Sequence, residues 1–115
     1  MNTYYCINLL ENYKYNKLLL RDSESINNKS NHFKNIEIIN IKNEINFIEQ
    51  YVNKLNFPYR NVLELRYFLN MPYRKIALQM SYSLQRIFQL RKKAIILISR
   101  MLKKDVEFHE SNTLP

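Results

Sequence analysis

The chain of 115 residues has the length of one domain, and its hydrophobic content of 46% excludes a chain too polar to fold. Because glycine is absent and only three prolines are present, the tight turns of hairpin-rich sheet proteins lack their usual residues, and we expect an all-α fold. The formal net charge of +8 indicates a polyanionic partner, either nucleic acid, anionic lipid or an acidic protein surface.

The single cysteine, Cys6, excludes an intramolecular disulfide. The chain contains neither a secretion signal nor the run of about 18 apolar residues that a membrane-spanning helix needs. We therefore expect a cytoplasmic protein with no membrane partner, in which Cys6 acts as a small hydrophobic residue.

The N-terminal part, residues 1–57, is predicted to form two helices separated by a polar loop at residues 22–35, which are rich in Ser and Asn. The first helix covers about residues 4–20, with Tyr5, Leu9, Tyr13 and Leu20 on one side. The second, about residues 36–55, has the clearest amphipathic pattern, with an apolar period of about 3.5 residues. We expect this seam to pack within its own domain, and pairing with a second copy is the alternative. Its apolar positions are Ile38, Ile41, Ile45, Ile48, Val52 and Leu55.

The C-terminal part, residues 58–104, is predicted to form three helices, over residues 59–69, 73–80 and 83–103. The connections between them are two or three residues long, as a helix-turn-helix requires. Residues 105–115 are expected to be a flexible tail. The apolar positions recur at helical spacing, which makes them candidates for the core. They are Val62, Leu63, Leu65, Ile76, Ala77, Ile87, Leu90 and Ala94.

The last of these helices has the features of a recognition helix. Ser83 can accept a hydrogen bond from a backbone N–H two or three residues later, so we expect it to cap a helix that starts at Leu84. Residues 58–104 hold eleven Lys and Arg against one acid, Glu64, which places the excess charge of the chain here. If the core positions face inward, the first turns direct outward Leu84, Gln85, Arg86, Phe88 and Gln89.

Residues 57–103 resemble region four of bacterial sigma factors. The resemblance is carried by the stretches VLELRY and YRKIA and by Ser83, Ile87, Lys93 and Ala94, which stand at the spacing of that pattern. With two helices ahead of this module, the whole chain is similar to the ArpU-like late-gene regulators of phages that infect low-GC Gram-positive bacteria. The resemblance implies an N-terminal helix pair packed on a helix-turn-helix that enters the major groove of DNA.

By this resemblance, base-reading positions fall on Leu84, Gln85 and Gln89. Positions that hold the DNA backbone fall on Arg74, Arg86 and Lys93. Because they are also positively charged, Lys75, Arg91 and Lys92 are further candidates for phosphate contact. The chain departs from the family at Leu84, a position that is often basic, and at Arg74 and Lys75, which replace residues that are often acidic. It also lacks the core-polymerase-binding and promoter-melting regions of a full sigma factor.

The C-terminal stretch AIILISRML has two apolar stripes, more than one contact face needs. One is Ala94, Leu97 and Met101, and the other is Ile95, Ile98 and Leu102. We favour a homodimer interface as the explanation, which would suit a two-fold operator, and cover by the N-terminal helices of the same chain is the alternative.

The sequence therefore predicts a sequence-specific, double-stranded DNA-binding transcription regulator, an activator of phage or mobile-element late genes that works in the bacterial cytoplasm. The alternative is a protein-interaction module that binds RNA polymerase or another regulator without reading DNA. His32 and His109 are far apart with no second ligand at metal-binding spacing, and no catalytic constellation is present, so we expect no metal, no cofactor and no enzyme activity.

Overall fold

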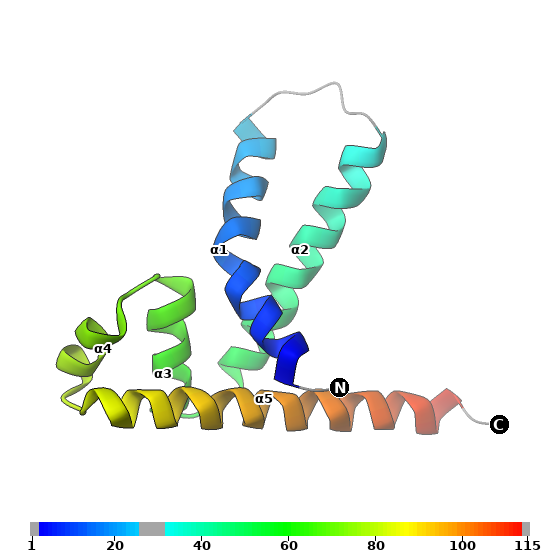
Figure 1. Cartoon of the computed structure of the whole chain (residues 1–115). Coiled ribbons are helices and arrows are strands. Elements are labelled where there is room, and N and C mark those ends of the chain that lie inside the picture. The colour runs from blue at the N-terminus through cyan, green and yellow to red at the C-terminus, as the bar shows by residue number, and fades with distance from the viewer. Residues whose placement is uncertain (1–2, 26–31, 114–115) are drawn as a thin grey trace.

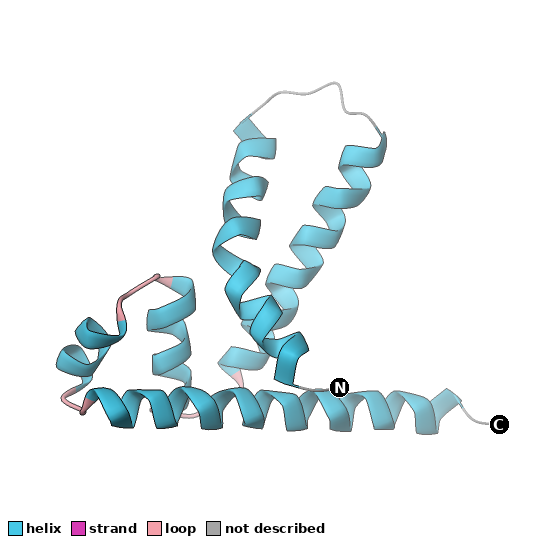
Figure 2. Cartoon of the chain, viewed as in Figure 1, coloured by secondary structure: helices cyan, strands magenta, loops and turns pink. Residues whose placement is uncertain are grey.

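The computed structural model describes the backbone of residues 3–25 and 32–113 and the side chains of residues 3–23 and 36–106. All regular structure in these residues is helical, with no strand, which confirms the all-α fold class (Figure 2). The elements are α1 (Thr3–Ser25), α2 (His32–Asn53), α3 (Tyr59–Leu63), the π-helix η1 (Glu64–Phe68), α4 (Tyr73–Met80) and α5 (Leu84–Thr113).

The long helix α5 is the base on which the other helices stand (Figure 1). α1 and α2 form an antiparallel pair that rises from the middle of α5, while α3, η1 and α4 cover its first turns. The molecule measures 50 × 46 × 19 Å, and its radius of gyration of 16.7 Å exceeds the roughly 13 Å typical of a compact domain of this length. Among the helices that the structure describes, none has both the length and the apolar content needed to cross a bilayer.

A large apolar cluster joins α1, α2 and the middle of α5. The seam of α2 packs inside the same chain, as expected, because Ile45, Ile48, Val52 and Leu55 are all buried. On α1 the buried side differs slightly from the expected one. Cys6, Leu9, Leu10 and Tyr13 point inward, whereas Tyr5 is 42% exposed.

The N-terminal helices also cover most of the apolar surface of α5. Ile95, Ile98 and Leu102 are buried against them, together with Ala94. The structure thus shows the second of the two explanations for the apolar stripes, cover by the N-terminal helices of the same chain, where a homodimer interface was favoured. Leu97 and Met101 are only partly buried, and they line a hollow of about 240 Å³ beside the end of α2.

Polar contacts fix the alignment of these helices. The Tyr13 hydroxyl donates a hydrogen bond to Glu49 Oε1 at 2.7 Å, and Asn16 Nδ2 donates to Glu44 Oε2 at 3.0 Å, so two contacts tie α1 to α2. The hydroxyl of Tyr51 on α2 donates to Asp105 on α5. Burial and this neighbouring carboxylate raise the pKa of Tyr51 to about 12.

A second, smaller cluster holds α3, α4 and the first turns of α5 together. Its buried members come from the candidate core set, and Leu65 is partly buried beside them. Leu63 and Ala94 from that set are buried in the larger cluster instead. The buried residues of the smaller cluster are Val62, Ile76, Ala77, Ile87 and Leu90.

Helices extend further than the sequence indicated. α1 continues through Ser25 and α2 starts at His32, so part of the expected 22–35 loop is helical, while residues 26–31 lie outside the described residues. α5 continues as helix through Thr113, where a flexible tail was expected from residue 105. Contact with Tyr51 on α2 supports α5 at Asp105, inside that expected tail.

The expected helix over residues 59–69 changes its winding partway. α3 is α-helical to Leu63, and the next five residues form η1, where the Leu69 N–H donates to Glu64 O, five residues earlier, at 3.0 Å. The wider turn brings Phe68 into a stacked contact with Tyr13, with ring centroids 4.2 Å apart. Local helical propensity predicts a helix here but contains no information on a tertiary contact of this kind.

The same substitution at a buried leucine and at an exposed leucine tests the packing of the core. Replacing the buried Leu90 with Ala should lower the free energy of unfolding by about 2 to 5 kcal/mol, because it leaves a cavity beneath α4. The same change at Leu78, which is 82% exposed on α4, should alter it by less than about 0.5 kcal/mol. Urea unfolding followed by circular dichroism measures both, and equal losses would contradict the packing described here.

The thiol of Cys6 reports the docking of α1. The side chain is fully buried, and burial raises the pKa of the Cys6 thiol to about 11, so little thiolate exists at pH 8. We expect Cys6 to react with a thiol reagent such as DTNB at least about a hundred times more slowly in the folded protein than in urea. Equal rates in the two states would show that α1 does not pack as described.

Candidate nucleic-acid interface

The connection between α4 and α5 forms without glycine. Ser81 ends α4 in the left-handed region at φ 59°, a conformation more usual for Gly or Asn. The N–H of Tyr82 then donates to Ala77 O at 3.0 Å, which satisfies a carbonyl at the end of α4. The chain turns within 81–83, so α5 starts immediately beside the end of α4.

The start of α5 is capped as the sequence predicted. Ser83 Oγ accepts a hydrogen bond from the Arg86 N–H at 3.0 Å, and α5 begins at Leu84. Ile87 and Leu90 are buried beneath α4. Because a helix turns by about 100° per residue, these buried positions direct Gln85 and Gln89 to the opposite side.

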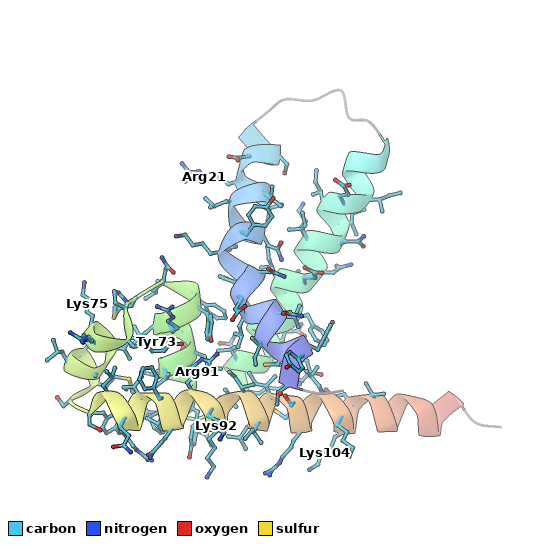
Figure 3. All side chains as sticks on the ribbon, in the orientation of Figure 1. Arg21, Tyr73, Lys75, Arg91, Lys92 and Lys104 are labelled. Carbon is cyan, nitrogen blue, oxygen red and sulfur yellow. The ribbon has the colours of Figure 1, made fainter. Side chains whose placement is uncertain are left out.

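The structure exposes most of the candidate DNA contacts. The described side chains of Gln85 and Gln89 are exposed, and Leu84 is half-buried. Figure 3 places Lys75 on α4, above the axis of α5, and Lys92 below that axis, so the cations lie on two elements and more than one side of them. The exposed cations from the candidate set are Arg74, Lys75, Arg86, Lys92 and Lys93.

Arg91 does not join this exposed set. It is half-buried, and its Nε donates a hydrogen bond to the Tyr67 hydroxyl on η1 at 2.7 Å. In Figure 3 it lies on the side of α5 that faces η1, across the helix from Lys92. The physical reason is its position four residues before buried Ile95 and seven before buried Ile98, which puts it on the same side of α5 as these residues. The charge of Arg91 alone placed it among the exposed phosphate contacts, and its half-buried position sets it apart from them.

Three further cations were missed, although their spacing carried the signal. Arg100, Lys103 and Lys104 are exposed on α5. Counting steps of three and four from Gln85 gives a single outward stripe through Gln89, Lys92, Ile96, Arg100 and Lys103. The exposed face of α5 is therefore cationic well beyond the turns that the sequence assigned to DNA.

Two aromatic contacts brace the exposed end of the module. Phe88, 46% exposed, meets Tyr73 of α4 edge-on with ring centroids 4.9 Å apart. The Lys93 Nζ lies 5.8 Å from the centroid of the Tyr59 ring.

The ion pairs that the structure describes, Lys17–Glu49 and Arg60–Glu64, include no cation of α4 or α5. The positive charge of these two helices is therefore not neutralised by those pairs.

Comparison with known proteins found no matching family model, no matching curated protein and no matching solved structure. The assignment of this surface consequently depends on its own residues and geometry.

The cap at Ser83 can be tested by its effect on stability. Replacing Ser83 with Ala removes the acceptor for the Arg86 N–H and should lower the free energy of unfolding by about 1 kcal/mol. Replacing it with Thr keeps a hydroxyl acceptor and should cost only a fraction of that. If Ser83→Ala and Ser83→Thr unfold at the same urea concentration as the unmodified protein, the hydroxyl does not cap α5.

Proposed function

We propose that this protein binds double-stranded DNA through a sigma-region-four-like helix-turn-helix made of α4 and α5, and that it regulates transcription. One observation carries the proposal: the first turns of α5 are held from behind by α4 and present exposed Gln85, Arg86 and Gln89 to solvent. An α-helix fits the major groove, which is about 12 Å wide. A capped, polar helix end on a packed support is the arrangement that base reading in this groove requires.

In this proposal the glutamines select the sequence. A glutamine side chain has one acceptor and two donor hydrogens, so it can bond N6 and N7 of adenine together. Gln85 and Gln89 are one helical turn apart, which directs both amides to the same groove floor. Leu84, half-buried at the start of α5, would supply an apolar contact such as that to a thymine methyl group.

The cations provide affinity without selecting a sequence. Arg74 and Lys75 on α4 and Arg86, Lys92 and Lys93 on α5 are exposed and would neutralise phosphates on the strands that flank the groove. Ordinary solvated surfaces mix both signs of charge, whereas residues 58–104 contain a single acid. That acid, Glu64, is paired with Arg60 through a contact of 3.4 Å.

The biological setting follows from the resemblance to ArpU-like regulators. We place the protein in the bacterial cytoplasm as an activator of phage or mobile-element late genes, acting on an operator near a promoter. A contact with RNA polymerase and a homodimer on a two-fold operator belong to the same proposal, and the homodimer would pair through residues other than Ile95, Ile98 and Leu102, which the same chain covers.

The alternative, a module that binds polymerase without reading DNA, would need the apolar face of α5 and the seam of α2 to be available. Ile95, Ile98 and Leu102 on α5 and Ile48 and Val52 on α2 are buried within the chain. We therefore favour DNA binding. The two functions separate in one experiment, because only a DNA-binding protein shifts random duplex at low salt.

Base reading is tested with an operator selected from a random duplex pool. Replacing Gln85 or Gln89 with Ala should weaken binding to the selected duplex by about 1 to 3 kcal/mol and leave binding to random duplex nearly unchanged. Gln50→Ala, at an exposed position on α2, serves as the matched control and should change neither. Fluorescence anisotropy measures each dissociation constant, and equal losses on both duplexes would remove the glutamines from base reading.

Phosphate contact is tested by the salt dependence of binding. Replacing Lys92 with Gln should weaken binding to every duplex alike and reduce the slope of log K against log salt by about one. Lys42→Gln removes the same charge from an exposed position on α2 and should leave the slope unchanged. If both variants keep the original slope, Lys92 does not contact the backbone.

A further inference from the structure

A cavity of about 280 Å³ lies where four helical elements meet, away from the outward face of α5. α1 contributes Glu11 and Lys14, η1 contributes Arg66 and Tyr67, α4 contributes Tyr73, and α5 contributes Arg91. In Figure 3, Tyr73 and Arg91 lie together between α5 and the elements above it. The proposed DNA contacts do not use this cavity.

Arg91 and Tyr67 form its fixed inner wall. The single bond from Arg91 Nε to the Tyr67 hydroxyl, 2.7 Å long, holds the guanidinium in place and leaves the N–H groups of its two terminal nitrogens. Burial raises the pKa of Tyr67 to about 12, so its hydroxyl keeps its proton at neutral pH. The wall therefore presents hydrogen-bond donors.

Arg66 forms a second wall that is also held in place. Its Nη1 donates to the Met71 carbonyl at 3.2 Å, and its guanidinium carbon lies 4.3 Å from the centroid of the Tyr73 ring. A guanidinium stacked on an aromatic ring keeps its edge free for in-plane hydrogen bonds. Two arginines are thus oriented in advance around one cavity.

The charges of the cavity are unbalanced. Lys14, Arg66 and Arg91 face a single carboxylate, Glu11, which leaves a local charge of +2. None of the three takes part in the ion pairs that the structure describes. Both arginines are half-buried, and their hydrogen-bond partners are neutral groups, the Tyr67 hydroxyl for Arg91 and the Met71 carbonyl for Arg66. An anion in the cavity would add charge-assisted hydrogen bonds to the N–H groups that these contacts leave.

The backbone around the cavity is also unusual. Arg66 and Tyr67 lie in the π-helix η1, and Asn70, which also lines the cavity, has a left-handed conformation at φ 55°. Helical π-turns and non-glycine residues in the left-handed region are frequent at functional sites. Here the π-turn places two cavity residues side by side on consecutive positions.

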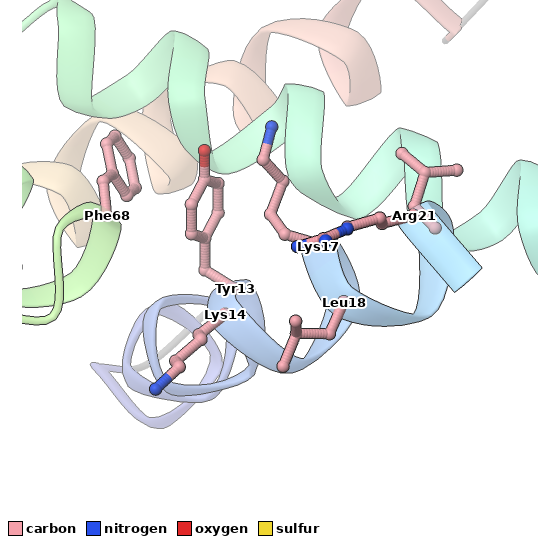
Figure 4. Close-up of a pocket in the computed structure, with 7 residues that line it drawn as sticks. Tyr13, Lys14, Lys17, Leu18, Arg21 and Phe68 are labelled. Carbon is pink, nitrogen blue, oxygen red and sulfur yellow. The ribbon is translucent and has the colours of Figure 1, made fainter. Parts of the chain in front are cut away.

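A second hollow nearby provides a contrast (Figure 4). It measures about 390 Å³ and is lined by Tyr13, Lys17 and Phe68 among others. Its Lys17 is already paired with Glu49 at 3.9 Å and lies 5.7 Å from the centroid of the Tyr13 ring. Figure 4 shows Lys14 pointing away from Tyr13 and Lys17. Lys14 and Arg21 line this hollow too, so the smaller cavity differs from it in having two arginines, Arg66 and Arg91, that are held by hydrogen bonds.

We propose that the cavity between α1, η1, α4 and α5 binds a phosphate group, as a small phosphomonoester or as a phosphate of the DNA backbone. The planar forks of two arginines match the geometry of phosphate oxygens. A phosphomonoester carries a charge of about −1.5 to −2 at pH 7, which complements the local +2. Because the walls come from α1 as well as from the module, bound phosphate would tie the N-terminal helix to α4 and α5.

The experiment titrates the full chain with glycerol 2-phosphate, without DNA, and observes the arginine Nε–H signals by NMR. Sodium chloride keeps the ionic strength constant. We expect saturable shifts at Arg66 and Arg91. Replacing Arg91 with Met should weaken binding about tenfold or more, whereas Arg100→Met, the same change at an exposed position of α5, should leave the affinity unchanged.

A further variant keeps the proposal falsifiable if Arg91→Met does not fold. Lys14 is exposed, so Lys14→Gln should fold normally and bind glycerol 2-phosphate several times more weakly than the unmodified protein, with Lys42→Gln as control.

A titration with short duplex DNA distinguishes the two sources of phosphate, the free ester and the DNA backbone. Shifts at Arg66 and Arg91 with duplex alone identify backbone phosphate, and shifts with glycerol 2-phosphate identify the free ester. No shift with either, or equal weakening by the control variants, would overturn the proposal, whether or not the protein binds DNA.

Discussion

The structure depends on one continuous helix, α5, whose inner face is buried in two separate apolar clusters. Ile87 and Leu90 of α5 pack under α4, and two turns later Ile98 and Leu102 pack under α1 and α2. Each such side chain contributes about 1.5 to 3 kcal/mol when it is buried. Because both clusters use the same side of α5, the opposite side is mainly exposed, and apart from the half-buried Ile96 its outward stripe is polar. The polar, cationic surface proposed to bind DNA is this exposed side of α5.

This double use of α5 couples the N-terminal helices to the surface proposed to bind DNA. α1 and α2 stand on the middle of α5, and the Tyr51 hydroxyl bonded to Asp105 holds α2 to it further along. Arg91 lies between the two clusters, faces inward and donates a hydrogen bond to Tyr67. The region between the clusters therefore contains a cation held in place and is not purely apolar. The protein thereby has an outer cationic face and an inner cationic cavity on opposite sides of one helix.

The sequence predicted what depends on local pattern and missed what depends on tertiary contact. The apolar period located α4 at residues 73–80, the Ser83 cap and the buried Ile87 and Leu90. It did not show that α5 would run through Thr113 or that η1 would widen, because the contacts at these places come from distant residues, Tyr51 on α2 and Tyr13 on α1. Within the candidate site, Arg91 was misplaced because its charge was weighed without its angle on the helix. Exposure of Gln85 and Gln89 followed from the period alone.

The most direct test of the account is an NMR titration of isotope-labelled protein with random duplex DNA at low salt. If the outward face of α5 enters the groove, the largest amide shifts should fall at residues 84–93, with smaller ones at the start of α4, while the α1–α2 pair changes little. Shifts centred on α1 and α2, or no shifts at all with duplex in excess, would contradict the claim that this face binds DNA.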